Sequence, residues 1–226
     1  MEPLPADQIR VLGVLVEKER TVPDSYPLTL NSLRTGCNQS SNRDPVTDYD
    51  ERDLQAALDL LREAKLTRIV YSPSNRAPKY RHVLDEVWDL DPSELAVLAV
   101  LLLRGPNTVP ELRTRTERYE PKVESVEAAL ESLAEKGFVV NIGRASGQRE
   151  DRWMHLVGGP VDADDIRAAA PSKMSTPTSA DRLAALEARV ARLEEALGME
   201  SDAPADRDSE GALDADDGGP SPVGGG

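Results

Sequence analysis

A polar stretch in the first third of the chain holds side chains suited to recognising nucleic-acid bases. Asn38, Gln39, Asn42 and Arg43 lie within six residues of one another. Asparagine and glutamine amides can pair with adenine edges, and an arginine guanidinium can pair with guanine. The same amides could instead bond to backbone groups of their own loop. Arg43 could likewise form a local ion pair with Asp44. We favour a contact with nucleic acid or another partner.

Further candidate contacts lie on the helix and hairpin that follow this stretch: Arg52, Gln55, Arg76, Lys79 and Arg81. A second set of arginines occupies the later half of the chain, at positions 113, 115, 118, 144, 149 and 152. Such side chains could hold backbone phosphates without reading bases. The alternative is that they only keep the surface soluble.

Catalysis has little support in the sequence. Cys37 with His82 or His155 would be a nucleophile and a base. Both histidines, however, occupy matching positions in two similar strands, as packing residues would. One cysteine and two distant histidines fall short of the four ligands usual for zinc. The segment from Gly143 to Gly147 is not followed by the lysine that a phosphate-binding loop requires. We expect no catalytic site, no metal site and no cofactor.

The elements that position these residues occur twice. Residues 54–70 have apolar side chains at helical spacing followed by a short β-branched run, and residues 126–142 repeat that pattern. Residues 9–15 are likewise echoed by residues 95–101. The offset falls from 86 to 72 residues, so the first copy holds 14 extra residues, mostly in the 38–48 region. This extra length suggests a role that the second copy lacks.

The pattern predicts an α+β, mainly α fold of two tandem winged-helix domains. Each has three helices followed by two strands. The expected helices span 6–20, 28–35, 51–65, 94–104, 108–118 and 122–136, and the expected strands span 67–71, 79–84, 138–142 and 152–157. The expected domains are residues 1–88 and 89–160.

The last third of the chain changes in character. We expect a linker over 161–180, a short amphipathic or coiled-coil helix over 181–197, and a disordered acidic tail over 198–226. The 181–197 segment has apolar residues at a and d spacing, which would form a homodimer or partner seam or pack back on its own domains. These residues are Leu183, Leu186, Val190, Leu193 and Leu197.

Charge and composition limit the function classes. The net charge is −14, of which −5 belongs to the first 160 residues and −9 to the rest. The tail could solvate the protein or mimic nucleic acid. No apolar run is long enough to span a membrane, and we expect no membrane partner. A single cysteine and the lack of a signal peptide fit a cytoplasmic location.

The polar loop also carries a family resemblance. Residues 26–33 (YPLTLNSL), 37–39 (CNQ) and 42–46 (NRDPV) resemble the YceH-like family of bacterial proteins. The resemblance covers residues 5–157, and the short helix after a linker is also similar. It implies tandem winged-helix domains, a cytoplasmic location and a regulatory or DNA-binding role. It supplies neither a catalytic site nor a defined ligand.

Two functional readings remain. The first, which we favour, is a DNA-associated transcriptional regulator in which the 38–43 loop and the first hairpin contribute more to DNA contact than the second domain does. The second is an acidic protein-interaction scaffold that resembles the segregation and condensation protein B class. Carboxylates on both expected third helices favour the scaffold, because they repel phosphates. They include Glu51, Asp59, Glu63, Glu124, Glu127, Glu131 and Glu135.

Overall fold

A computed structural model describes residues 2–71, 77–120, 125–144 and 148–162, all within one compact unit. Arg76 and everything after residue 162 lie outside these residues. The expectations for the 161–180 linker beyond its first two residues, the 181–197 helix with its Leu183–Leu197 seam, and the 198–226 tail therefore stay predictions.

The first half of the described chain is built from three helices and a small sheet. Its elements are α1 (Ala6–Thr21), a 3-10 turn (Pro23–Ser25), β1 (Leu28–Thr29), α2 (Leu30–Cys37), α3 (Glu51–Glu63), β2 (Thr67–Val70) and β3 (Lys79–His82). The strands are antiparallel in the order β1-β3-β2. Helix α3 begins where Asp50 accepts the Arg52 and Asp53 amides, which satisfies donors that a helix start leaves free.

The second half repeats this order after a short connecting helix. Its elements are α4 (Leu84–Trp88), α5 (Pro92–Arg104), β4 (Asn107–Thr108), α6 (Val109–Thr116), α7 (Val126–Glu135), β5 (Val139–Gly143) and β6 (Arg152–His155). The strand order β4-β6-β5 matches the first sheet. Asp91 and Thr108 cap α5 and α6, each with a glutamate three residues on that bonds back to the cap amide. The repeat seen in the sequence is thus present among the described residues.

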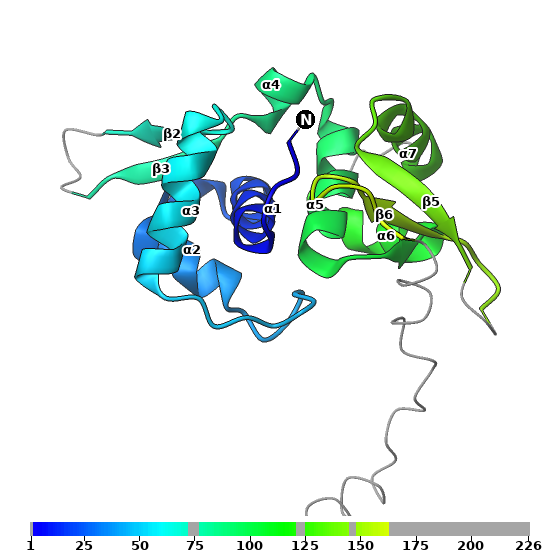
Figure 1. Cartoon of the computed structure of the whole chain (residues 1–226), viewed down its shortest axis with the longest axis horizontal. Coiled ribbons are helices and arrows are strands. Elements are labelled where there is room, and N and C mark those ends of the chain that lie inside the picture. The colour runs from blue at the N-terminus through cyan, green and yellow to red at the C-terminus, as the bar shows by residue number, and fades with distance from the viewer. Residues whose placement is uncertain (1, 72–76, 121–124, 145–147, 163–226) are drawn as a thin grey trace, which may run out of the picture. The chain divides into compact units, whose positions relative to one another are not determined.

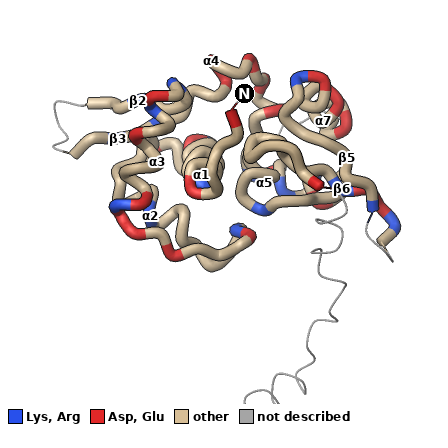
Figure 2. The backbone as a smooth tube through the Cα atoms, in the orientation of Figure 1, with Lys and Arg blue, Asp and Glu red and all other residues tan. Residues whose placement is uncertain are grey.

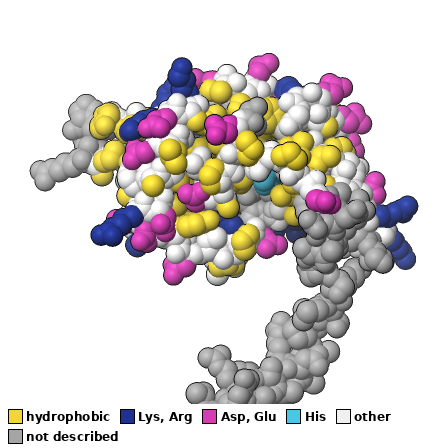
Figure 3. All heavy atoms as spheres, viewed as in Figure 1, with side chains coloured by type: hydrophobic (Ala, Val, Ile, Leu, Met, Phe, Trp, Pro, Cys, Tyr) yellow, Lys and Arg dark blue, Asp and Glu magenta, His cyan; other side chains and the backbone are white. Residues whose placement is uncertain are grey.

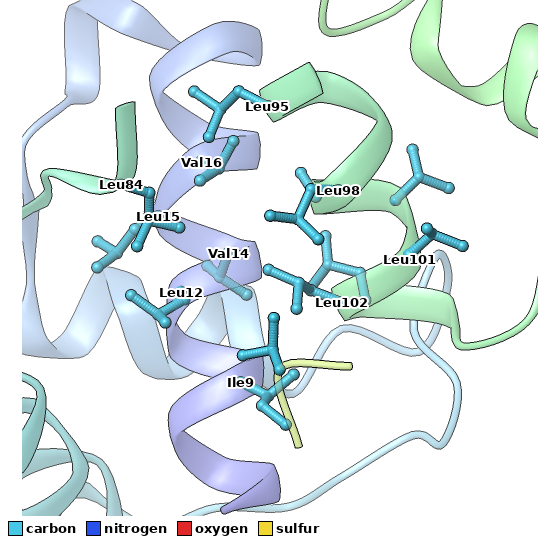
Figure 4. Packing of buried hydrophobic residues seen from close by; sticks show 14 of the residues in the cluster. Ile9, Leu12, Val14, Leu15, Val16, Leu84, Leu95, Leu98, Leu101 and Leu102 are labelled. Carbon is cyan, nitrogen blue, oxygen red and sulfur yellow. The ribbon is translucent and has the colours of Figure 1, made fainter. Parts of the chain in front are cut away.

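Helices α1 and α5 form the centre of the molecule, with one sheet and its helices on each side (Figure 1). Leu95, Leu98 and Leu102 point from α5 toward α1 (Figure 4). Leu12 and Leu15 point the opposite way, toward Leu84. Because both helices are buried on nearly every side, the two halves share one hydrophobic core.

Close packing of these two helices requires a glycine. A Cβ on Gly13 of α1 would lie 2.9 Å from both Cγ and Cδ2 of Leu103, and 3.2 Å from Cβ of Leu102. Interiors are packed too tightly to accept such an atom without movement. Gly13 therefore sets how near α5 can approach.

The expected α+β class is confirmed, and each expected helix and longer strand in the described residues is present with shifted ends. Three elements were missed. Strands β1 and β4 have two residues each, too few for an alternating pattern. Helix α4 begins at Leu84, which we had placed at the end of a strand. Among the described residues, no helix is long and apolar enough to cross a bilayer.

Candidate functional site

The polar loop over residues 38–50 turns its amides inward. Asn38 donates from Nδ2 to the Tyr49 carbonyl (2.8 Å) and accepts the Tyr49 amide at Oδ1 (2.9 Å). Gln39 Oε1 accepts from Arg43 (2.8 Å) and from Lys18 Nζ (3.5 Å). These contacts match the alternative in which the amides bond to neighbouring protein groups. The amide groups named here therefore stabilise the loop.

Arg43 is buried, and its partner is Glu17 of α1 rather than its neighbour Asp44. The guanidinium contacts both Glu17 carboxylate oxygens and also donates to the Gly36 carbonyl (2.9 Å). Burial alone would raise the pKa of Glu17, but hydrogen bonding and charge from Arg43 outweigh it and lower the pKa. Only 6% of Arg43 is exposed. The structure thus places Arg43 in an internal ion pair, and a nucleic-acid contact by this residue stays a prediction.

The loop also connects the two halves of the molecule. The Asp44 amide donates to the Leu103 carbonyl at the end of α5 (2.9 Å). Arg104 donates to Asn42 Oδ1, and Arg10 donates to the Pro45 carbonyl (2.6 Å). The 14 extra residues of the first copy thus contain a strap, residues 42–45, that attaches α1 to α5. Attachment of α1 to α5 is thus one role of the insertion. It differs from the expected role, which was contact with nucleic acid or a partner.

A second polar contact crosses the same junction. The Tyr119 hydroxyl, from the segment after α6, donates to Glu17 Oε1 (3.3 Å). Burial raises the pKa of Tyr119 above its usual range, and the nearby Glu17 charge adds to this. Glu17 is therefore the shared acceptor for groups from both halves. Sequence reasoning missed it because Glu17 opens the charged run Glu17–Arg20 at the end of α1, which resembles an ordinary solvated helix end.

The other predicted contacts of the first half come from two neighbouring elements. Gln55 accepts from the Tyr80 hydroxyl (3.1 Å), and Arg81 is paired with Glu86. Arg52 is exposed at the start of α3, and Lys79 is half-buried on β3. These residues thus lie on α3 and β3, two elements that the Gln55–Tyr80 bond joins. A nucleic-acid or partner contact by them stays a prediction, and Arg76 lies outside the described residues.

Arginines of the second half border two hollows. Arg104, Arg115 and Arg152 line a cavity of about 220 Å³ beside Asn42 and Asp44. In Figure 2 the lower end of α5 carries a basic residue opposite the tip of the 38–50 loop. The other hollow is an open depression between α6, α7 and the β5–β6 hairpin. It is lined by three arginines, Arg113, Arg144 and Arg149, and also by Trp153.

An apolar groove lies at the other side of the molecule. It is formed by the N-terminal segment, the end of α3 and α4, with a volume of about 620 Å³. We call it the N-terminal groove and define it by Pro3, Leu4, Leu60, Leu66, Val87 and Trp88. Its charged lining residues are Glu2 and Glu63. No sequence pattern predicts this groove, because its walls come from three segments that are distant in the chain.

Groups that could support covalent catalysis are held in place by the fold. Cys37 is buried, and burial raises the pKa of its thiol to about 12. His82 Nε2 lies 2.8 Å from Glu19 Oε2. Burial lowers the pKa of His155 to about 4, and its Nδ1 has no partner in the described structure. The described residues contain no cluster of three or more His, Cys, Asp or Glu side chains placed to bind a metal ion.

Comparison with known proteins covers both halves of this architecture. Residues 4–148 match the family described as "Protein of unknown function, DUF480". The chain belongs to this family. It is 45% identical to a UPF0502 protein of Solibacter usitatus over 86% of this chain and 94% of that protein. It is 46% identical to a UPF0502 protein of Geobacter sulfurreducens over 82% and 88%, respectively. For a UPF0502 protein of Pseudomonas syringae pv. tomato the identity is 42%, over 86% and 90%.

The DUF480 match includes α1, the 38–50 loop, α5 and most of the second half. The strap and the shared core therefore both lie inside the region that defines the family. The family description states no reaction, ligand or partner, so function has to be argued from the geometry of this chain.

Proposed function

We propose that the two halves are winged-helix units and that together they form a protein-binding module. The order helix, strand, helix, helix, strand, strand, with the last strand central in the sheet, supports the winged-helix assignment. Both units are fixed on a common core. This role corresponds to the scaffold alternative rather than to base-specific DNA recognition.

The N-terminal groove is the observation that supports protein binding best. Leu60 is 51% exposed and Val87 is 47% exposed, although both belong to helices that bury other apolar side chains. Neighbouring exposed apolar groups in a hollow indicate an interaction surface. Figure 3 shows hydrophobic side chains spread over the visible face among acidic and other groups, with most Lys and Arg toward the edges of the view.

The walls of the groove are held by both units. The Leu4 amide donates to the Val157 carbonyl (2.9 Å), which fixes the N-terminal segment to the second unit. Trp88 packs against Phe138 with ring centroids 4.9 Å apart. A preformed groove reduces the ordering cost of binding. The shape therefore depends on the arrangement of the two units.

Charge identifies the chemistry of the partner. Glu2 and Glu63 line the groove, while no Lys or Arg does so. The exposed positions Asp85 and Glu86 belong to the same short helix as Val87. We infer that the partner presents an amphipathic segment with apolar anchors and flanking Lys or Arg, a mode in which a helix occupies a hydrophobic groove.

Site-specific photo-crosslinking tests this function. A benzophenone amino acid at Val87 should capture one partner protein in cells, through a segment containing apolar and basic residues. The Leu60→Asp variant should abolish that product because it places a charge in the apolar wall. The same crosslinker at Tyr71, which is 78% exposed away from the groove, is the control. If Val87 and Tyr71 give the same products, or if the product survives Leu60→Asp, the proposal is wrong.

A second candidate function is attachment to DNA through backbone phosphates. The depression between α6, α7 and the hairpin favours it, because Arg113, Arg144 and Arg149 lie there beside Trp153. Glu127 opposes it by bonding Arg113 at 2.6 Å. If these arginines hold phosphates, the triple alanine variant should weaken duplex binding and reduce the salt slope by about 0.9 for each lost contact. If the salt slope measured by fluorescence anisotropy is unchanged, these arginines do not contact DNA phosphates. Nuclease treatment of captured complexes separates the two candidates.

A further inference from the structure

The cavity bordered by the strap carries more positive than negative charge. Arg104 comes from the end of α5, Arg115 from α6 and Arg152 from β6. The carboxylates in its lining are Asp44 and Glu111. Three guanidinium groups from three different elements thus line one small volume of about 220 Å³, together with Arg43, whose charge is paired with Glu17.

The carboxylates leave part of this positive charge unpaired. Glu111 lies 3.7 Å from Arg115 Nη2 and 3.9 Å from Arg152 Nη2, both beyond hydrogen-bond distance. One of its oxygens already accepts the Thr108 amide at 2.9 Å, in the cap of α6. Charged groups normally take shorter contacts when partners are available. Glu111 therefore forms long ion pairs with both guanidinium groups but hydrogen-bonds to neither of them.

The remaining contacts of the arginines hold them in place. Arg152 donates from Nε to Gln148 Oε1 (3.0 Å) and from Nη1 to the Pro106 carbonyl (2.9 Å). Arg104 donates to Asn42. Partial burial lowers the pKa of Arg104, and repulsion from Arg115 adds to this effect. Such crowding of cations around a polar hollow favours an anion.

We propose that this cavity binds the phosphate group of a small phosphorylated molecule. Guanidinium forks match the oxygens of a phosphate, and a tetrahedral dianion accepts bonds from several directions. The cavity has room for one such group and a few further atoms. Asn42, Arg43 and Asp44 belong to the strap, while Arg104, Arg115 and Arg152 belong to the second unit. The bound phosphate therefore fastens the two units together.

This site is separate from the N-terminal groove and shares no lining residue with it. Its test is therefore independent of the protein-binding function. Failure of phosphate binding would leave the groove proposal intact, and failure of partner capture would leave the phosphate site intact.

The experiment is titration of the full chain with pyrophosphate and with inorganic phosphate by isothermal calorimetry, at fixed ionic strength set by chloride. We expect saturable one-site binding and a rise in Tm with ligand concentration. Arg104→Gln and Arg115→Gln should each weaken binding at least tenfold. Arg62→Gln, an exposed arginine of α3 that lines neither this cavity nor the depression beside Trp153, should bind as the wild type does.

A competition experiment distinguishes a free phosphorylated ligand from a nucleic-acid phosphate. Pyrophosphate binding that a short DNA duplex does not displace supports a free phosphorylated ligand. Displacement by the duplex, with DNA binding also lost in Arg115→Gln, would instead assign the cavity to a nucleic-acid phosphate and overturn the small-molecule proposal. Absence of saturation and of any Tm rise in the wild-type chain would overturn the site altogether. That last measurement holds even if a variant fails to fold.

Discussion

At the residue scale, the Glu17–Arg43 pair shows how a side chain expected at the surface becomes part of the interior. Arg43 follows an asparagine in the left-handed region, since Asn42 has φ of 61°. Asparagine tolerates this conformation better than most residues. The turn lets Arg43 reach Glu17 while Asn42 accepts from Arg104.

Removing Arg43 should destabilise the protein strongly. Arg43→Ala leaves Glu17 buried with Lys18 as its remaining cationic neighbour, and we expect a loss of about 3–5 kcal/mol in the free energy of unfolding. Urea unfolding measures this loss.

The control is Arg52→Ala, which removes an exposed arginine and should change the free energy of unfolding by no more than about 0.5 kcal/mol. In a Glu17→Leu, Arg43→Met double variant the loss should be smaller than the two single losses combined. A loss below 1 kcal/mol for Arg43→Ala would contradict the buried pair.

His155 should make stability depend on pH. Its pKa is about 4 in the folded state, because burial disfavours the charge, and about 6.5 in the unfolded chain. Below pH 6.5 the unfolded state therefore binds a proton that the folded state does not, and stability falls. Between pH 7 and pH 5 this contribution is about 2 kcal/mol.

Comparing urea unfolding of the wild type and His155→Asn at the two pH values isolates this effect. Carboxylates whose pKa is lowered in the folded state, such as Glu17 and Glu94, also lose stabilisation as pH falls. They are present in both proteins, so their effect cancels in the comparison. The variant should lose about 2 kcal/mol less than the wild type. Parallel losses would show that His155 titrates normally.

At the element scale, the sequence predicted the helices and longer strands because their apolar periods are clear and their caps are explicit. Asp91, Pro92 and Glu94 placed the start of α5 within two residues. The site was harder to predict. The polar loop looked like a recognition loop since its amides had no visible partners in the sequence. Those partners, Tyr49 and Lys18, are found only through the fold.

The groove and the phosphate cavity are likewise not predictable from the sequence, because their residues meet only in the fold. Arg115 and Arg152 could be singled out as basic residues, but nothing in the sequence brought them to Arg104 or to the strap. The N-terminal groove needs Leu4, Leu60 and Val87 to meet from separate elements. Local patterns report helix faces, whereas these sites depend on long-range packing.

The crossing of α1 and α5 gives a prediction about packing. Gly13→Val should destabilise the protein by about 1–3 kcal/mol, because its side chain would overlap Leu103 and displace α5. Thermal and urea unfolding measure the change. Ala56→Val, at an exposed position of α3, introduces the same residue and should cost about 0.5 kcal/mol. Equal effects at the two positions would mean that the crossing adapts freely.

At the scale of the whole molecule, contacts between the two proposed winged-helix units decide whether the units act as one. The shared core, the strap and the Tyr119–Glu17 contact all cross between them. Both proposed sites depend on this arrangement. The cavity takes lining residues from both units, and the walls of the groove are held by the Leu4–Val157 and Trp88–Phe138 contacts with the second unit. A module whose halves opened separately would lose the groove and the cavity together.

Unfolding of the full chain should therefore be cooperative across both units. Cys37 reports on the first unit, since its buried thiol reacts with a disulfide reagent only after opening. Tryptophan fluorescence from Trp153 in β6, with Trp88 changed to Phe, reports on the second. We expect the free energy of opening from thiol labelling to equal that from fluorescence within about 0.5 kcal/mol. The Gly13→Val variant should lower both by the same amount. If Cys37 becomes reactive at urea concentrations where Trp153 is still native, the units unfold separately and the shared core does not couple them.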